Sequence, residues 1–146
     1  MTIQAQRPTT SKRVLVVDDD ESLRALVDLS ARSFDPSIDV DFVTNGEDAV
    51  QRLSRSPVYD LVLVDFLLEE PPNGLMLRNS CKHLLPDCSF TMMSSMPLDM
   101  AEVDPADFLK KPFTVAECQS FLAAHLEPQQ DLPQEPPPEA AQDSSD

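Results

Sequence analysis

Positively charged residues are scarce in this sequence. Eleven Lys and Arg residues stand against 26 Asp and Glu residues, which gives a formal net charge of -15 at pH 7. Such a chain has no general attraction to DNA, RNA or an anionic membrane, because all three are negatively charged. The charge therefore argues against a nucleic-acid-binding or membrane-surface function.

Cysteine is also rare, and long apolar runs are absent. Cys81, Cys88 and Cys118 are odd in number and lack paired metal-ligand spacing, so we assign them no chemistry. Nothing resembles a signal peptide, and no apolar stretch reaches the roughly 18 residues that suggest a membrane span. These absences predict a cytoplasmic protein with reduced thiols.

The length of 146 residues is that of one domain. We expect a flexible leader over residues 1–11, a folded domain over 12–126 and a disordered tail over 127–146. The tail holds five prolines and six acidic residues but no Lys or Arg, a composition that disfavours a packed core.

Short apolar runs alternate with segments of helical periodicity, a pattern typical of βαβ units around a parallel sheet. The apolar runs predict five strands, at 14–17, 38–42, 61–64, 90–93 and 108–109. Helices are predicted at 21–34, 47–55, 74–85 and 115–126. We expect Asp20 to be the N-cap of the first helix and Thr114 and Glu117 to form a capping box at the last.

Five polar residues stand where these apolar runs end: Asp18, Asp19, Asp65, Ser94 and Lys111. Because ligands of open α/β sheets bind outside the carboxyl ends of the strands, we expect these side chains to share one site. Two carboxylates about 4 to 5 Å apart repel by roughly 3 to 4 kcal/mol at an effective dielectric constant near 20. Three of them together require a cation, and hydrated Mg²⁺ suits an all-oxygen cluster.

The same residues predict phosphoryl transfer. A carboxylate can accept a phosphoryl group when a metal ion and a lysine neutralise the non-bridging oxygens. We assign this role to Asp65, with Asp18 and Asp19 as metal ligands and Lys111 as the second positive charge. The Ser94 hydroxyl can donate to a phosphoryl oxygen once its loop moves toward Asp65. Lys111 precedes a proline, which favours an extended lysine backbone and permits a cis peptide bond.

These residues resemble the motifs of the receiver domain of two-component response regulators across roughly residues 12–126. Val14-Leu-Val-Val-Asp-Asp-Asp20 is similar to the first strand and acidic pair of that family, and Tyr59-Asp-Leu-Val-Leu-Val-Asp65 is similar to its third strand and phosphoacceptor. Ser94-Ser95 and Lys111-Pro112-Phe113 resemble two further motifs. The resemblance implies a doubly wound α/β fold with a five-stranded parallel sheet in the flavodoxin-like order 2-1-3-4-5.

The resemblance also implies a function. Asp65 would be phosphorylated by a histidine kinase or a phosphotransfer protein, and Ser94 and Phe108 would form a switch in which the serine moves toward the phosphate and vacates space for the ring. Mg²⁺ would be held by four groups: Asp18, Asp19, Asp65 and the backbone carbonyl of Leu67. Such a protein is a phosphoryl-accepting switch rather than an enzyme.

Two departures from the family pattern lie close to the phosphoacceptor. The loop 69–74 is one residue longer than usual and carries two extra acids. Leu67 and Met96 put apolar bulk two residues beyond Asp65 and Ser94, where it would crowd the in-line approach of water. We therefore expect slow autodephosphorylation and a long-lived phosphorylated form.

A third departure concerns the segment before the last strand. Only 16 residues separate Ser94 from Lys111, although a parallel crossover needs about a dozen or more residues. We expect a shortened fourth helix, at 98–103. Because that helix contributes to the usual dimer surface of the family, we expect a monomer.

We expect a single-domain receiver that signals by phosphorylation-dependent protein binding or by phosphorelay. Two alternatives stay open. A pseudo-receiver would be a non-phosphorylated interaction scaffold with a vestigial site. A haloacid-dehalogenase-type phosphatase would use Asp18 as nucleophile and Asp20 as acid, because 18–22 also reads Asp-x-Asp-x-Ser, although the chain is short for that fold and lacks a later Gly-Asp-x-x-x-Asp run.

Overall fold

A five-stranded parallel sheet forms the centre of the protein. The computed structural model describes residues 12–55, 58–96 and 103–126, so the expected leader and tail lie outside the described residues. The strands are β1 (Arg13–Val17), β2 (Asp39–Val43), β3 (Leu61–Asp65), β4 (Ser89–Ser94) and β5 (Phe108–Lys110). Their order is β2-β1-β3-β4-β5, which confirms the predicted topology.

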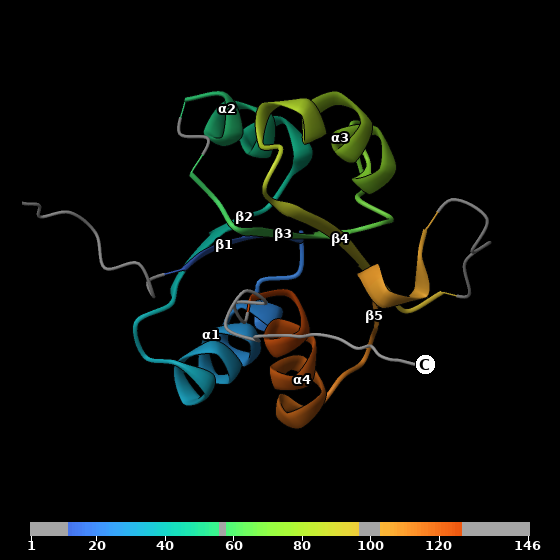
Figure 1. Ribbon diagram of the computed structural model, residues 1–146. Helices are drawn as coiled ribbons and strands as arrows, with labels where there is room; N and C mark the ends of the chain where they lie inside the picture. The colour runs from blue at the N-terminus through green and yellow to red at the C-terminus, as the bar shows by residue number, and fades with distance from the viewer. Residues whose placement is uncertain (1–11, 56–57, 97–102, 127–146) are drawn as a thin grey trace, which may run out of the picture.

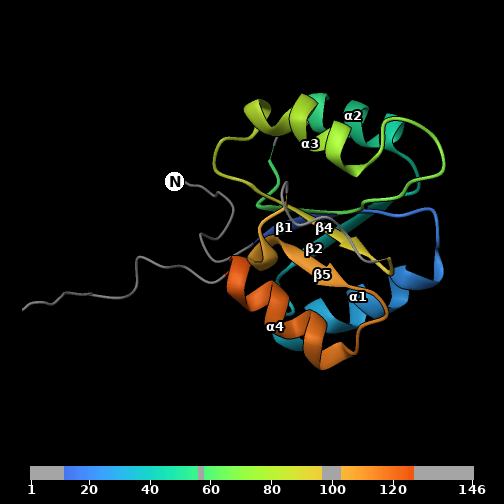
Figure 2. The same ribbon diagram turned by 90° about the vertical axis from the view of Figure 1, so that its right-hand side faces the viewer.

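Helices cover both faces of the sheet. Within the described residues they are α1 (Ser22–Phe34), α2 (Gly46–Arg55), α3 (Gly74–Cys81) and α4 (Val115–Leu126). Figure 1 shows α1 and α4 on one face and α2 and α3 on the other, and the turned view in Figure 2 shows the same layers. This arrangement is the predicted doubly wound α/β fold. None of the described helices has the length and apolar character that crossing a membrane requires.

The central strands are apolar on both sides because each side packs against helices. Alternate residues of β1 and β3 contribute to two separate cores, as expected for a side-chain period of two. One core contains the strand residues Val14, Val16, Leu61 and Leu63 and includes residues of α1 and α4. The other contains Leu15, Val17, Val62 and Val64 and includes residues of α2 and α3. Strand β3 is buried along its whole length, in agreement with its predicted central place.

The helix starts follow the capping residues in the sequence, with one correction. Thr114 and Glu117 form the predicted capping box, with the Glu117 N–H donating to Thr114 Oγ1 over 3.1 Å and the Thr114 N–H to Glu117 Oε1 over 2.8 Å. The expected N-cap role of Asp20 is wrong, because α1 begins one residue later and Glu21 is its N-cap. The Asp20 carboxylate instead accepts hydrogen bonds from the backbone N–H and the hydroxyl of Ser22.

One expected helix differs in form from the structure, and another falls almost wholly on residues that the structure does not describe. The helix predicted at 74–85 ends at Cys81 and continues as the 3₁₀ helix η1 (Lys82–Leu84), a tighter turn that is common at helix ends. The short helix expected at 98–103 lies outside the described residues except for Val103. The described part of that crossover includes the 3₁₀ helix η2 (Pro105–Asp107), which leads directly into β5.

Candidate phosphoryl-transfer and metal site

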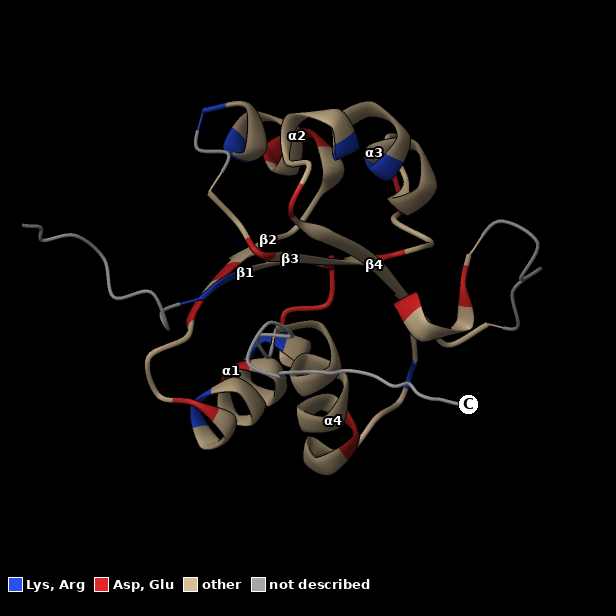
Figure 3. Ribbon diagram, in the orientation of Figure 1, with Lys and Arg blue, Asp and Glu red and all other residues tan. Residues whose placement is uncertain are grey.

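The predicted site residues lie at the carboxyl ends of four neighbouring strands. Asp18 and Asp19 follow β1, and Asp65 and Ser94 are the last residues of β3 and β4. Lys111 follows β5, and its backbone N–H donates to the carbonyl of Ser94 over 2.9 Å. The sheet order therefore brings residues that are far apart in the sequence to one edge. Figure 3 shows the acidic turn between β1 and α1 at this edge.

Three carboxylates converge there. One oxygen each from Asp18, Asp19 and Asp65 lies within 4.8 Å of the other two, and this is the one such group among the described residues. Asp18 is fully buried and Asp65 is only 7 % exposed, whereas Asp19 is open to solvent. Mg²⁺ binds oxygen at 2.0–2.1 Å, so ligands on its opposite sides lie about 4 Å apart. The spacing and the donor set therefore fit a hydrated Mg²⁺ ion.

Lys111 provides positive charge inside this cluster. Its Nζ lies 2.8 Å from Asp18 Oδ2 and 3.4 Å from Asp65 Oδ2, and its side chain is 17 % exposed. The Lys111–Pro112 peptide bond is cis, the isomer that the sequence permits. The lysine thus reaches from the end of β5 to the ends of β1 and β3. One ammonium group does not balance three carboxylates, so the cluster keeps an excess of negative charge.

The surroundings shift the pKa values of this pair. Burial raises the pKa of Asp18, although hydrogen bonds from Lys111 and from the Asp20 N–H oppose that rise. Burial alone would lower the pKa of Lys111, but its hydrogen bond to Asp18 and the charges of Asp18 and Asp65 raise it above the usual value. The raised pKa keeps the ammonium charged at neutral pH, as a group that neutralises phosphoryl oxygens must be.

Ser94 and Phe108 are placed differently from the carboxylates. Ser94 is buried, and its Oγ accepts a hydrogen bond from the Met96 N–H over 3.1 Å. Among the described residues, this bond ties the hydroxyl to its own loop rather than to Asp65. Phe108 pairs with Met92 in the sheet and packs, partly buried, against the core that faces α2 and α3.

Leu67, two residues beyond Asp65, makes a backbone contact that the sequence did not indicate. The backbone N–H of Leu67 donates to Asp65 Oδ1 over 3.0 Å and so fixes the orientation of the carboxylate. The side chains of Leu67 and Met96 are 50 % and 52 % exposed. Both apolar side chains therefore stay in solvent near the end of the sheet, and neither is part of the core.

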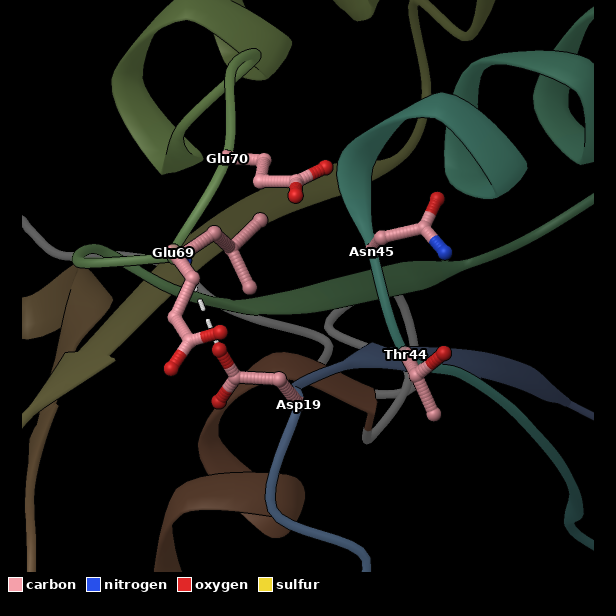
Figure 4. Close-up of a pocket in the computed structure, with 6 residues that line it drawn as sticks. Asp19, Thr44, Asn45, Glu69 and Glu70 are labelled. Carbon is pink, nitrogen blue, oxygen red and sulfur yellow. Dashed lines mark hydrogen bonds between the residues drawn. The ribbon is translucent and has the colours of Figure 1, made fainter.

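A second unpredicted contact joins the long loop to Asp19. The Glu69 N–H donates to Asp19 Oδ2 over 3.4 Å. Figure 4 shows the adjoining pocket, with Asp19 below and Glu69 and Glu70 above it. Its volume is about 80 Å³, and it is lined by Asp19, Thr44, Asn45, Leu68, Glu69 and Glu70. In the sequence, Glu69 and Glu70 were the signal that this loop differs, and they did not indicate a contact with Asp19.

Asp20 does not support the phosphatase alternative. Hydrogen bonds from the hydroxyl and backbone N–H of Ser22 lower its pKa. A general acid needs the opposite, a pKa raised toward the working pH. The Asp20 carboxylate therefore accepts hydrogen bonds from Ser22, the first residue of α1, and is poorly suited to protonate a leaving group.

Comparison with known proteins gives one family. A model of the response regulator receiver domain matches residues 14–123. A search of curated proteins found no match.

Several solved structures share the fold. The signal receiver domain of a Vibrio parahaemolyticus protein is 26 % identical, with a TM-score of 0.68, over 80 % of this chain and 91 % of its own. A response regulator receiver protein from Sinorhizobium medicae is 25 % identical, with a TM-score of 0.66, over 80 % and 94 %. A two-component transcriptional regulator from Clostridium phytofermentans is 26 % identical, with a TM-score of 0.64, over 80 % and 92 %.

Proposed function

The chain belongs to the response regulator receiver domain family, and on this premise we propose that Asp65 accepts a phosphoryl group from a phosphohistidine. The observation that carries the proposal is the position of the Lys111 ammonium, which lies against both Asp18 and Asp65 in a cluster of three carboxylates. An ordinary helix-capping turn needs neither three converging carboxylates nor a lysine from a distant strand. Phosphoryl transfer to a carboxylate is favoured by both, because the lysine and a metal ion held by the carboxylates neutralise the non-bridging oxygens.

The proposed step is an in-line displacement at phosphorus. A carboxylate oxygen of Asp65 attacks, the new O–P bond forms as the N–P bond breaks, and the imidazole nitrogen keeps the electron pair of the broken bond. Lys111 neutralises a non-bridging oxygen, and Asp18 holds the lysine in place. The Leu67 N–H, bound to Oδ1, keeps the carboxylate oriented during the approach. Receiver domains act in this way as phosphoryl-accepting switches rather than as classical enzymes.

Mg²⁺ is the proposed cofactor. Asp18, Asp19, Asp65 and the Leu67 carbonyl would hold it, and the open side of the cluster at Asp19 would admit it. When bound, the ion supplies positive charge that offsets the repulsion between the carboxylates and the phosphoryl group.

Labelling by acetyl phosphate in the presence of Mg²⁺ tests this proposal. We expect the intact mass to show one added phosphoryl group in the wild type and none in Asp65→Asn or in the presence of EDTA. Asp39→Asn is the matched control, since Asp39 is an exposed residue of β2. Equal labelling of Asp65→Asn would refute the assignment of the acceptor. An unlabelled wild type would instead favour the pseudo-receiver scaffold.

The proposed output is a change at the surface around β5. Phosphorylation would draw Ser94 toward Asp65 and let Phe108 turn inward, and a downstream protein would read the altered surface or receive the phosphate. We propose that a histidine kinase or a phosphotransfer protein donates the phosphoryl group. We further propose that the protein is a cytoplasmic monomer, that residues 12–126 form the receiver domain, and that this domain binds neither nucleic acid nor membrane. Partner binding by the full chain with and without acetyl phosphate tests this output.

A further inference from the structure

The first residue of α2 has no room for a side chain. A Cβ on Gly46 would lie 2.3 Å from the carbonyl oxygen of Pro72 and 2.8 Å from its Cγ. Neither glycine among the described residues has a positive φ, so Gly46 is required for space and not for backbone conformation. The loop that follows Asp65 thus rests directly on the start of α2.

The start of α2 is firmly held. Asn45 Oδ1 accepts from the Asp48 N–H over 2.8 Å, and the Asn45 carbonyl accepts from the Ala49 N–H over 3.2 Å. A methyl group added at Gly46 would therefore displace the loop rather than the helix. To restore an ordinary van der Waals distance, the carbonyl of Pro72 would have to move by about 1 Å.

Both ends of the loop are held as well. At its start, the Leu67 N–H is bonded to Asp65 and the Leu68 side chain is buried. At its end, Asn73 Oδ1 caps α3 by accepting from the Met76 N–H over 2.9 Å. A displacement at Pro72 therefore spreads into residues 69–72, which lie between these anchors.

Residues 69–72 include the backbone N–H that contacts Asp19. The Glu69 N–H lies 3.4 Å from Asp19 Oδ2, already near the limit for a hydrogen bond, so a shift of about 1 Å would break it. Loss of a group that hydrogen-bonds to a metal-ligating carboxylate typically lowers the metal affinity by about 10- to 100-fold. Gly46 is thus linked to Asp19 through the loop.

We infer that Gly46 is a positioning residue of the metal site. Its missing side chain lets the lengthened loop lie on α2, and the loop in turn presents the Glu69 N–H to Asp19. This inference rests on the proposed role of Asp19 as a Mg²⁺ ligand. It assigns a reason to the glycine that begins α2.

The test compares Gly46→Ala with the wild type as full chains. In metal-free protein, the ¹H–¹⁵N resonance of Glu69 shifts, while circular dichroism shows the fold retained. Titration calorimetry with Mg²⁺ shows an affinity lower by about tenfold. Ser54→Ala, at an exposed position near the other end of α2, changes neither quantity. Wild-type Mg²⁺ affinity in Gly46→Ala would overturn the inference.

A second pair of variants tests the same contact without touching Gly46. Glu69→Gln removes the charge but keeps the backbone N–H, whereas Glu69→Pro removes both. Glu69→Pro binds Mg²⁺ about tenfold more weakly than Glu69→Gln if the N–H positions Asp19. Equal affinities would refute the link. A wild type that binds no Mg²⁺ would instead remove the metal site itself, and the Glu69 resonance in metal-free Gly46→Ala would still report whether the loop moves.

Discussion

Removing one carboxylate from the cluster should stabilise the metal-free protein. Asp19 is the best position, because it is exposed and its carboxylate accepts from the neutral N–H of Glu69, whereas Asp18 and Asp65 both pair with Lys111. Asp19→Asn keeps the shape of the side chain and an oxygen that can accept from Glu69. The substitution therefore removes repulsion and little else.

The distances set the size of the effect. At 4.8 Å, each of the two repulsions on Asp19 would amount to about 3.5 kcal/mol at an effective dielectric constant of 20. Because water reaches Asp19, the effective constant is higher, and we expect roughly 1 kcal/mol for each pair. Asp19→Asn should thus raise the free energy of unfolding by about 1 to 2 kcal/mol, which corresponds to about 5 °C in melting temperature.

Thermal unfolding in EDTA and in Mg²⁺ checks this prediction. In EDTA the variant melts higher than the wild type. In Mg²⁺ the order reverses, because the wild type gains about 2.7 kcal/mol at 100 times its dissociation constant and the variant has lost a ligand. Asp39→Asn, on the exposed edge strand, should change the unfolding free energy by less than about 0.5 kcal/mol in either buffer. A variant that melts at or below the wild type in EDTA would show that the carboxylates do not repel as argued.

Further measurements on three parts of the structure test the same reasoning. Leu67→Asn combined with Met96→Glu should speed autodephosphorylation several-fold by admitting water, and a double variant that loses phosphate at the wild-type rate would end that hypothesis. Burial raises the pKa of Cys88 to about 12, so iodoacetamide at pH 8 should label it far more slowly in the folded than in the unfolded chain, and equal rates would contradict this. Burial and the hydrogen bond to Asp41 raise the pKa of Tyr59, the single tyrosine, so its absorbance titration should have a midpoint above 10. Because the pKa of Tyr59 is higher in the folded than in the unfolded chain, the stabilisation that its hydroxyl provides is complete below pH 10 and is lost as the pH rises through the folded value. Tyr59→Phe removes the hydrogen bond to Asp41 and should lower the free energy of unfolding by about 1 kcal/mol at pH 7. An unchanged free energy of unfolding would count against the contribution of this bond.

The sheet and the ends of its strands could be predicted because their signals are local and repeated. An apolar run such as 61–64 can be buried on both faces only in the middle of a covered sheet, and the polar residue that ends it must then emerge at the carboxyl edge. The positions of Asp18 and Asp65 follow from this rule alone. The capping box before α4 was equally predictable, since it depends on two residues three apart.

Loop contacts could not be predicted, because they depend on backbone positions that side-chain patterns do not encode. The approach of Pro72 to Gly46 and the contact of the Glu69 N–H with Asp19 involve main-chain atoms of the loop that follows Asp65. The cap of α1 was misassigned for a related reason. Both Asp20 and Glu21 precede the helix, and a shift of one residue in its start decides which of them is the N-cap.

The two unequal contacts of Lys111 explain how this site can be stable without a phosphoryl group. Asp18 is fully buried, so an uncompensated charge there would be far more costly than one on the solvent-exposed Asp19. The lysine accordingly lies closer to Asp18 than to Asp65, 2.8 Å against 3.4 Å. A phosphoryl group on Asp65 would add negative charge on the side of the longer contact and draw the ammonium toward it. Because that contact already exists, the proposed reaction requires only a small movement of the lysine.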